Sequence, residues 1–262
     1  MIVKFVLLFA AGIAAGFVNV AAGGGSLLTL PALIFFGLPP TVANGTNRIA
    51  VMMGSITSMA KFRQEGYFNP ALGFKLAIPA VAGAILGSSL AIKMPDNVFR
   101  IVLSVVMLIV LALIIVRPRV AQPEGPLRTL TIGRQVVLLA AFFAVGVYGG
   151  FVQAGVGFII ITALSMLTGM SLLRINSLKV FAIAVYTLPS LAVFATAHKI
   201  DFAPGLVLAA GNGLGAWIGT IVSVKRGDRF IRALLIVAVL MMTAKVSGLW
   251  DWFAADVFGF GR

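Results

Sequence analysis

The chain has 262 residues, of which 61% are apolar and only 10% are charged, and its mean hydropathy is strongly positive. A soluble domain carries about 25% charged residues, so this composition excludes a soluble globular protein and predicts a polytopic membrane protein without a sizeable domain outside the bilayer. Cysteine is absent, which excludes disulfides and thiol chemistry, and the net charge of +13 is typical of loops anchored to anionic lipid rather than of nucleic-acid binding.

Apolar segments follow one another along the whole chain. We expect them at 2–22, 26–37, 43–62, 71–92 and 98–116, and then at 135–153, 155–169, 175–197, 205–224 and 229–247. The longer ones can cross about 30 Å of hydrocarbon as helices, but 26–37 is too short at about 1.5 Å per residue. The sequence therefore divides into an N-terminal transmembrane repeat (1–116), a cytoplasmic linker (117–134), a C-terminal transmembrane repeat (135–247) and an interfacial tail (248–262).

The first apolar run is interrupted by Gly23, Gly24 and Gly25, with Asn19 just before the break. Irregular backbone at membrane depth has to line a water-filled cavity or be buried in protein, because an unsatisfied N–H group in lipid costs several kcal/mol. A helix that begins after the break would point free N–H groups and a partial positive charge into that cavity, which suits an anion. Close helix packing is the alternative explanation for the glycines. Three in a row before a short segment favour a binding site.

The two halves of the chain resemble each other. A shift of 134 residues places Asn19 on Gln153 and superimposes Gly12, Gly16 and Gly23 on Gly146, Gly150 and Gly157. A shift of 132 residues places Asn44 on Asn176. An ordered series of this kind predicts an internal repeat, a recurrent plan of secondary transporters.

The distribution of Lys and Arg predicts how the repeats sit in the membrane. If each glycine break reverses the chain, eleven cations fall on one face: Lys61, Arg63, Arg117, Arg119, Arg128, Arg134, Arg174, Lys225, Arg226, Arg229 and Arg232. The other face then keeps six: Lys4, Arg48, Lys93, Arg100, Lys199 and Arg262. This bias fits the positive-inside rule, whereas unbroken crossings give none. The sequence therefore predicts an all-α polytopic membrane protein of two inverted repeats, each a re-entrant broken-helix hairpin plus three spanning helices, with both termini periplasmic.

A second group of polar residues lies in TVANGTNRIA (41–50) and in its repeat partner LRINSLKVFA (173–182). Each segment puts an Asn and then a basic residue near a predicted helix start: Asn44, Asn47 and Arg48 in the first, and Asn176 and Lys179 in the second. Helix N-capping is the alternative explanation for Asn44, Thr46 and Asn176, and snorkelling to the headgroups is the alternative for Arg48 and Lys179. The paired placement beside the breaks favours a role in binding.

The acidic residues exclude several classes of function. All seven lie in loops or at the C-terminus, which disfavours a cation site and a carboxylate proton relay. The sequence also lacks Ser/His/Asp, paired-carboxylate, His-rich metal and phosphate-loop patterns. We therefore expect neither an enzyme nor a cofactor or metal.

The glycine break, the proline-containing short segment and the motif GLPPTVANGTN (37–47) together resemble the TauE/SafE sulfite exporter family, also called the 4-toluene sulfonate uptake permease family. The resemblance covers the whole chain and is sharpest at 12–48. It implies movement of sulfite, sulfonates or related sulfur-containing anions across a bacterial inner membrane. The second half departs from the first, because Gly155-Val156-Gly157-Phe158 replaces the glycine run and no proline corresponds to Pro31.

These observations predict a transporter, most simply an exporter, that binds its anion near the membrane midplane and alternates access by rocking one repeat against the other. An anion channel, an importer coupled to Na⁺ or H⁺ and a non-transporting scaffold or sensor remain alternatives. The expected partners are the small anion and the lipid bilayer, and the aromatic tail leaves open whether a homodimer forms. The expected binding residues are Asn19, Gly23, Gly24, Gly25, Asn47, Arg48, Gln153 and Lys179, with Asn44, Thr46 and Asn176 as secondary candidates.

Overall fold

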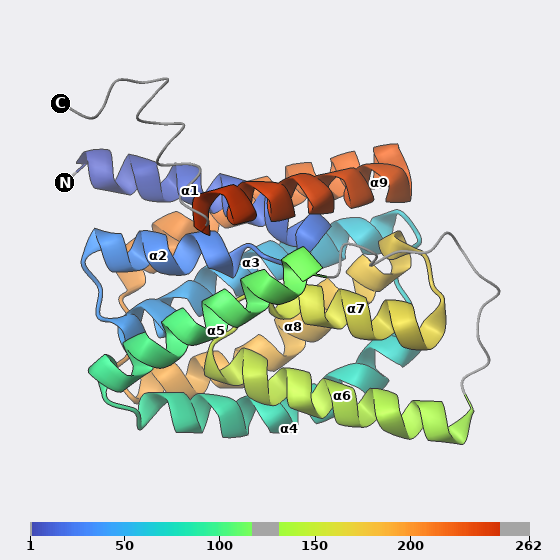
Figure 1. The fold of residues 1–262 in the computed structure, drawn as a ribbon, viewed down its shortest axis with the longest axis horizontal. Coiled ribbons are helices and arrows are strands. Elements are labelled where there is room, and N and C mark those ends of the chain that lie inside the picture. The colour runs from blue at the N-terminus through green and yellow to red at the C-terminus, as the bar shows by residue number, and fades with distance from the viewer. Residues whose placement is uncertain (1, 117–130, 247–262) are drawn as a thin grey trace.

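The structure, a computed structural model, describes residues 2–116 and 131–246, and its regular elements within these ranges are all α-helices. The first half contains α1 (Ile2–Ala22), α2 (Ser26–Phe36), α3 (Pro40–Gln64), α4 (Pro70–Ile92) and α5 (Asp96–Val116). The second contains α6 (Ile132–Phe151), α7 (Val156–Thr168), α8 (Leu172–Thr196) and α9 (Phe202–Val246) (Figure 1). The predicted tail and most of the predicted linker lie outside the described residues, as do the side chains of 227–246.

The helices confirm the predicted all-helical membrane class. In the described ranges, five helical stretches are long and apolar enough to cross a bilayer: α1, α4, α6, α8 and the part of α9 up to Arg226. Helix α3 has 25 residues and is long enough, at about 37 Å, but it is less apolar than these five. Its first half carries buried polar side chains, so this part of the helix faces protein rather than lipid.

One predicted boundary is wrong. The sequence analysis expects separate segments at 205–224 and 229–247, whereas α9 is helical without interruption from Phe202 to Val246. The residues between the two segments are Lys225, Arg226, Gly227 and Asp228. Lys and Arg are good helix formers and a single glycine costs only about 1 kcal/mol in a helix interior, so a polar stretch of this kind need not end a helix.

Helices from different halves of the sequence lie side by side. Helices α1 and α9 run along one long side of the molecule and α4 and α6 along the opposite side, with α3 and α8 between them (Figure 1). Helix α2 returns toward the side on which α1 begins, and α7 returns toward the side on which α6 begins (Figure 1). Both short helices therefore turn back inside the molecule instead of crossing it.

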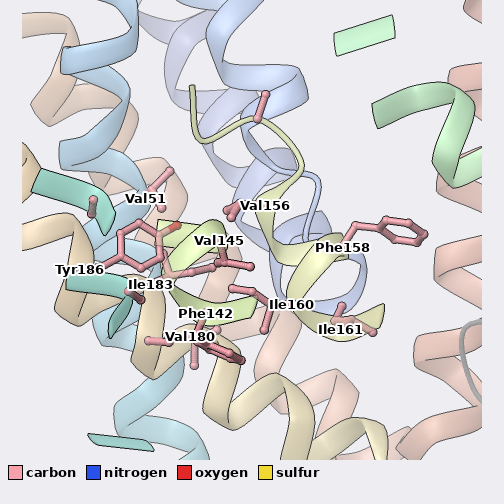
Figure 2. Packing of buried hydrophobic residues seen from close by; sticks show 14 of the residues in the cluster. Val51, Phe142, Val145, Val156, Phe158, Ile160, Ile161, Val180, Ile183 and Tyr186 are labelled. Carbon is pink, nitrogen blue, oxygen red and sulfur yellow. The ribbon is translucent and has the colours of Figure 1, made fainter. Parts of the chain in front are cut away.

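The largest apolar cluster of the described residues lies around α6 and α7. It includes Phe142 of α6, Ile160 of α7, Ile183 of α8 and, from the first half of the chain, Val51 of α3 (Figure 2). Lipid is as apolar as these side chains, so their contribution to stability comes from close packing rather than from removal of apolar surface from water. The packing fixes the ends of α6 and α7 relative to α3 and α8.

Helices α3 and α8 end with the same backbone geometry. Glu65 and Ala197 both have φ −86° and ψ 5°, and the residues after them are left-handed, Gly66 with φ 76° and His198 with φ 53°. The next backbone N–H group then donates to a carbonyl five residues back. Tyr67 donates to Phe62 at 3.1 Å after α3, and Lys199 donates to Phe194 at 3.0 Å after α8. This is the Schellman C-cap, which normally has glycine in the left-handed position.

Candidate functional site

The first helix break leaves three backbone donors free. Helix α1 ends at Ala22, Gly23 is left-handed with φ 73°, and α2 begins at Ser26. The N–H groups of Gly24, Gly25 and Ser26 have no hydrogen-bond acceptor in the described part of the chain. Because all three residues are buried, these donors are available to a ligand at the start of α2.

The second half also has a helix break, although the glycine run is replaced there. Helix α6 ends at Phe151 and α7 begins at Val156. Two residues between them are left-handed, Gly155 with φ 68° and Gln153 with φ 66°. A left-handed conformation is strained for a residue other than glycine, and such residues are held by their surroundings. The N–H groups of Ala154 and Gly155 find no acceptor among the described residues.

The two breaks touch each other. A Cβ atom added to Gly23 would lie 2.3 Å from the carbonyl carbon of Gly157, and one added to Gly157 would lie 2.5 Å from the Cα of Gly23. Only glycine fits at both positions. The glycine run therefore brings the backbone directly after α1 against the first turn of α7 in the interior of the molecule.

Lys179 of α8 holds the C-terminal end of α1. Its Nζ donates to the carbonyl oxygens of Asn19 and Val20, at 2.8 and 2.9 Å, and to Oδ1 of Asn176 at 2.7 Å. The side chain is completely buried. All three donors of the ammonium group are used, and a cation at a helix C-terminus is favoured by the helix dipole.

Arg48 of α3 does the same for the C-terminal end of α6. Its two terminal nitrogens donate to the carbonyl oxygens of Gly149 and Gly150, at 3.1 and 2.5 Å, and its guanidinium lies 4.4 Å from the ring centroid of Phe194. Asn44, one turn earlier on α3, donates to the carbonyl of Phe151 at 2.8 Å. Each broken helix is thus capped by a buried cation from the other half of the sequence.

Neither buried cation has a counter-charge in the described part of the chain. Lys61 and Glu65 form an ion pair, but they lie on the surface and far from the breaks in sequence. Arg48 and Lys179 are both 0% exposed, so neither snorkels to the headgroups, and counting Arg48 with the cations of one membrane face is wrong. Two positive charges without a carboxylate make the region around the breaks electropositive.

Asn47 anchors the first turn of α2. Its Oδ1 accepts from the hydroxyl of Thr29 at 2.6 Å, and its Nδ2 donates to Oγ of Ser26 at 3.2 Å. The corresponding start of α7 is apolar, with Val156, Gly157 and Phe158. The two breaks therefore differ in chemistry, and the first is the more polar one.

The two predicted amides lie at the breaks, in different settings. Asn19 is 8% exposed, and no hydrogen bond of its side chain is found among the described residues. Gln153 is 1% exposed; its Nε2 donates to the hydroxyl of Thr187 at 3.1 Å, while its Oε1 is buried without a partner there. Both side chains retain hydrogen-bonding capacity for a ligand.

The secondary candidates have structural partners. The N-capping interpretation is wrong for Asn44 and Asn176, because α3 begins at Pro40 and α8 at Leu172, a full turn earlier. It is also wrong for Thr46, whose hydroxyl instead accepts from the backbone N–H of Asp201 at 2.9 Å and holds the start of α9 against α3.

Sequence reasoning missed Tyr186 and Thr187 on α8. The hydroxyl of Tyr186 is buried without a partner in the described residues, and a Cβ on Gly149 would lie 2.7 Å from it. Figure 2 shows this tyrosine within the apolar cluster. One signal was available: at a shift of 132 residues Thr187 aligns with Ser55 and Ser190 with Ser58, so small hydroxyl residues recur at matching, completely buried positions of α3 and α8.

Comparisons with known proteins match the chain to one family and to probable membrane transporters. Residues 8–246 match the family described as Sulfite exporter TauE/SafE. A probable membrane transporter protein of Haemophilus influenzae is 29% identical over 249 residues, which cover 94% of this chain and 96% of the relative. The probable membrane transporter protein YfcA of Escherichia coli K12 is 27% identical, with 92% and 88% covered, and the probable membrane transporter protein ORF9 of a Sinorhizobium species is 25% identical, with 91% and 90% covered. No solved structure matches the chain.

Proposed function

The chain belongs to the sulfite exporter TauE/SafE family, and from that premise we propose that it is a secondary transporter of sulfur-containing anions such as sulfite or organosulfonates in a bacterial inner membrane. One observation carries the proposal. Arg48 and Lys179 are fully buried beside two touching helix breaks, and no described carboxylate neutralises them. A buried site of this charge favours an anion over a cation or a neutral solute.

The chemistry of the breaks matches that of the substrate class. A sulfite or sulfonate group presents three oxygens, each of which accepts hydrogen bonds. The free N–H groups of Gly24, Gly25 and Ser26, together with the side chain of Asn19, supply donors at the first break. Arg48 and Lys179 keep their hydrogen bonds to the helix ends in this proposal and act on the anion through their charge. Because the direct ligands are neutral, the anion is attracted without being trapped.

The arrangement of the helices supports alternating access. Helices α2 and α7 turn back from opposite sides of the molecule (Figure 1), and the break before α2 touches the first turn of α7 through Gly23 and Gly157. We infer two inverted repeats, each with one re-entrant hairpin, and a substrate site near the membrane midplane where the hairpins meet. A site between two hairpins is reached from either side by small movements of the helices around it.

Export is the direction that the charge of the substrate favours. An anion that leaves a cell with a negative interior gains about 2.3 kcal/mol per charge for every 100 mV. Uptake of an anion against this potential needs a coupling ion, which backbone carbonyls at the breaks could bind, whereas export needs none. We therefore propose an exporter.

Counterflow in proteoliposomes tests the transport mechanism. Vesicles are loaded with ³⁵S-sulfite, and its release is measured with and without unlabelled sulfite outside. A carrier releases label faster when external substrate is present, since the loaded site returns more readily than the empty one. Conductance without exchange would establish an anion channel instead, and the absence of any flux would leave a scaffold or sensor as the explanation.

A ligand screen tests the substrate class and the site together. Thermal unfolding is measured with sulfite, sulfate, thiosulfate, taurine, isethionate and sulfoacetate, and a true substrate raises the melting temperature. Asn19→Ala and Gln153→Ala are each expected to weaken binding of the stabilising anion by roughly 10- to 150-fold, because a hydrogen bond to a charged group is worth about 1.5–3 kcal/mol. Asn69→Ala is the matched control, since this amide caps α4 at an exposed position. Equal effects of all three variants would argue against the site.

A further inference from the structure

Helices α1 and α9 are locked together through glycine. A Cβ atom would lie 2.6 Å from the carbonyl oxygen of Leu208 if added to Gly12, and 2.2 Å from that of Asn212 if added to Gly16. From the opposite side, a Cβ on Gly215 would lie 2.0 Å from the carbonyl oxygen of Ile13. The two backbones are in direct contact at several levels, which leaves no room for one helix to slide along the other.

Helices α4 and α6 are locked in the same way. A Cβ on Gly83 would lie 2.2 Å from the carbonyl oxygen of Phe143, and one on Gly146 would lie 2.1 Å from that of Ala80. Gly87 and Gly150 repeat the contact one turn further along, at 2.0 and 2.3 Å from carbonyl oxygens of the facing helix. Like the α1–α9 pair, this pair joins the first half of the sequence to the second.

The remaining contacts complete two groups of helices that cross the sequence repeats. The first mixed bundle consists of α1, α2, α3 and α9, because α9 packs along both α1 and α3 and α2 lies against α1 and α3. The second mixed bundle consists of α4, α6, α7 and α8, by the corresponding contacts. Figure 1 shows α1 with α9 on one side of the molecule and α4 with α6 on the other. Helix α4 of the first half therefore packs with helices of the second half, and α9 of the second half packs with helices of the first.

Contacts between the two mixed bundles are less extensive. They include the packing of α3 on α8, one contact of glycine backbones between Gly23 and Gly157, and side-chain hydrogen bonds from Arg48 to the end of α6 and from Lys179 to the end of α1. Long side chains follow small displacements by changing rotamer, whereas interlocked backbones do not. The chain passes from one bundle to the other at the left-handed caps Gly66 and His198.

We propose that the transport motion runs between the two mixed bundles and not between the two sequence repeats. This inference rests on the proposed transport function. The hinges are then the connections around Gly66 and His198. The hydrogen bonds of Arg48 to the end of α6 and of Lys179 to the end of α1 change as the bundles move. A substrate held at the breaks lies between the two moving parts.

Distances between spin labels test the inference. The chain contains no cysteine, so Val6→Cys on α1, Ile78→Cys on α4, Val136→Cys on α6 and Leu214→Cys on α9 give exposed labelling sites with no background. Four pairs are made from these sites. Pairs 6/214 and 78/136 lie within a mixed bundle, whereas pairs 6/78 and 136/214 lie within a sequence repeat. Distances are measured in nanodiscs without anion and with saturating sulfite.

The two motions give opposite results with the same four sites. Movement between mixed bundles leaves 6/214 and 78/136 unchanged and shifts 6/78 and 136/214. The reverse pattern, a shift in every pair, or no shift in any pair of a protein that transports sulfite each overturn the inference. Sulfite flux through the unlabelled protein is measured separately, so that an inactive protein counts against the proposed function and not against the choice of moving parts.

A covalent tether gives a functional readout. A Cβ on Gly213 of α9 would lie 3.1 Å from Cγ of Met53 of α3, so a disulfide between Met53→Cys and Gly213→Cys joins two helices of one mixed bundle and of different repeats. Sulfite flux is expected to survive oxidation of this pair. Flux that stops on oxidation and returns on reduction would show that α3 and α9 have to move apart, and each single-cysteine variant controls for the substitutions.

Discussion

Lys179 and Arg48 hold the ends of two broken helices by donating to backbone carbonyls, where a soluble protein would often pair them with carboxylates. A helix C-terminus carries only about half a negative charge, so each cation keeps part of its charge for other partners. The sequence places both residues beside the breaks. It could not give their carbonyl partners, because these contacts join residues 160 and 102 positions apart.

Replacing Lys179 should destabilise the protein. Lys179→Met leaves the carbonyls of Asn19 and Val20 without a donor in a buried position, and we expect a loss of roughly 2–4 kcal/mol. Lys75→Met is the control, because Lys75 is exposed and its ammonium donates to the side chain of Gln135 at the surface, so the loss of stability should stay within about 0.5 kcal/mol. Thermal unfolding in detergent micelles measures both. Equal melting temperatures would contradict the capping role.

The contact between the breaks can be separated from backbone strain. Gly23→Ala and Gly66→Ala both force alanine into a left-handed conformation, with φ near 73° and 76°, which costs about 1–2 kcal/mol. Only the first also creates a contact, because nothing lies within 4 Å of a Cβ on Gly66. We expect Gly23→Ala to unfold at a clearly lower temperature than Gly66→Ala and to lose sulfite flux. A smaller loss for Gly23→Ala would show that the breaks are not in contact.

Some residues of the candidate site could be predicted from the sequence and others could not. Asn19 and Gln153 were identified by repeat alignment, and both are at the breaks. Tyr186 was missed because a single tyrosine in an apolar helix has the pattern of a core residue. Its buried, unpartnered hydroxyl becomes visible only when the helices are packed, since Gly149 of another helix makes the space for it.

At the scale of the elements, the two left-handed helix caps carry different residues in one geometry. The backbone after α3 uses Gly66, for which a positive φ has no steric cost, whereas the backbone after α8 uses His198. Histidine is exposed there and tolerates the conformation better than a β-branched residue does. The second cap is therefore the more strained of the two.

Exchanging the two cap residues should have opposite effects. His198→Gly is expected to stabilise the protein by up to about 1 kcal/mol, and Gly66→His to destabilise it by a similar amount, because only the strain at the cap changes. Melting temperatures of the two variants in micelles are compared with that of the parent. Destabilisation by His198→Gly would mean that the imidazole makes a contact that outweighs the strain.

The start of α3 is held by the first residue of α5. Asp96 accepts from the backbone N–H of Thr41 at 3.2 Å and from its hydroxyl at 2.5 Å. These bonds, the hydroxyl bond above all, favour the carboxylate and lower the pKa of Asp96 below its usual value. Since the folded-state pKa lies below the unfolded-state value, this contact stabilises the protein above the ordinary pKa and stops doing so as pH falls through the lowered one.

Asp96→Asn should accordingly be destabilising at neutral pH and nearly silent in acid. The amide imitates the protonated carboxyl group, so the difference in melting temperature from the parent should be constant above about pH 5 and shrink below about pH 4. Thr41→Val removes the hydroxyl donor and should reduce the pH dependence of the parent. A difference that grows as the pH is lowered would contradict the depressed pKa.

The breaks and the single continuous helix α9 show what a linear pattern can predict about elements. Glycine runs and a segment too short to span the bilayer were enough to predict that α1 and α2 are separate helices. Charge between two apolar segments was not enough to predict a helix end, because α9 continues through Lys225 and Arg226. A break requires residues that disfavour the helix, and a change in polarity alone does not supply them.

At the scale of the whole molecule, the exchange of α4 and α9 between the halves could not be predicted. The glycines at 12, 16, 83, 87, 211 and 215 predict close helix contacts, but they do not identify which glycine-bearing helices are in contact. Choosing α9 as the partner of α1 depends on shape and on the positions of α3 and α8 between them. The sequence analysis therefore expected the repeats to move as units, whereas we propose that the mixed bundles do.

Two glycines of α6 test the close packing of this exchange. Gly146→Ala would place a Cβ 2.1 Å from the carbonyl oxygen of Ala80 and should destabilise the protein by about 1–3 kcal/mol. Gly133→Ala, in the first turn of the same helix, meets nothing within 4 Å and should be neutral or slightly stabilising. Thermal unfolding of both variants is the measurement. A neutral Gly146→Ala would mean that α4 and α6 are not in backbone contact.

The partner of α1 is the last helix that the structure describes, and this has a consequence for biosynthesis. When α1 enters the membrane, the backbone that its glycines face at Leu208 and Asn212 has not yet been translated. Neither half can complete its packing alone, because α4 also packs against a helix, α6, that is synthesised after it. The native packing of α1 therefore forms late, after α9 has been inserted. Two halves expressed as separate polypeptides should be degraded singly and protected when they are synthesised together.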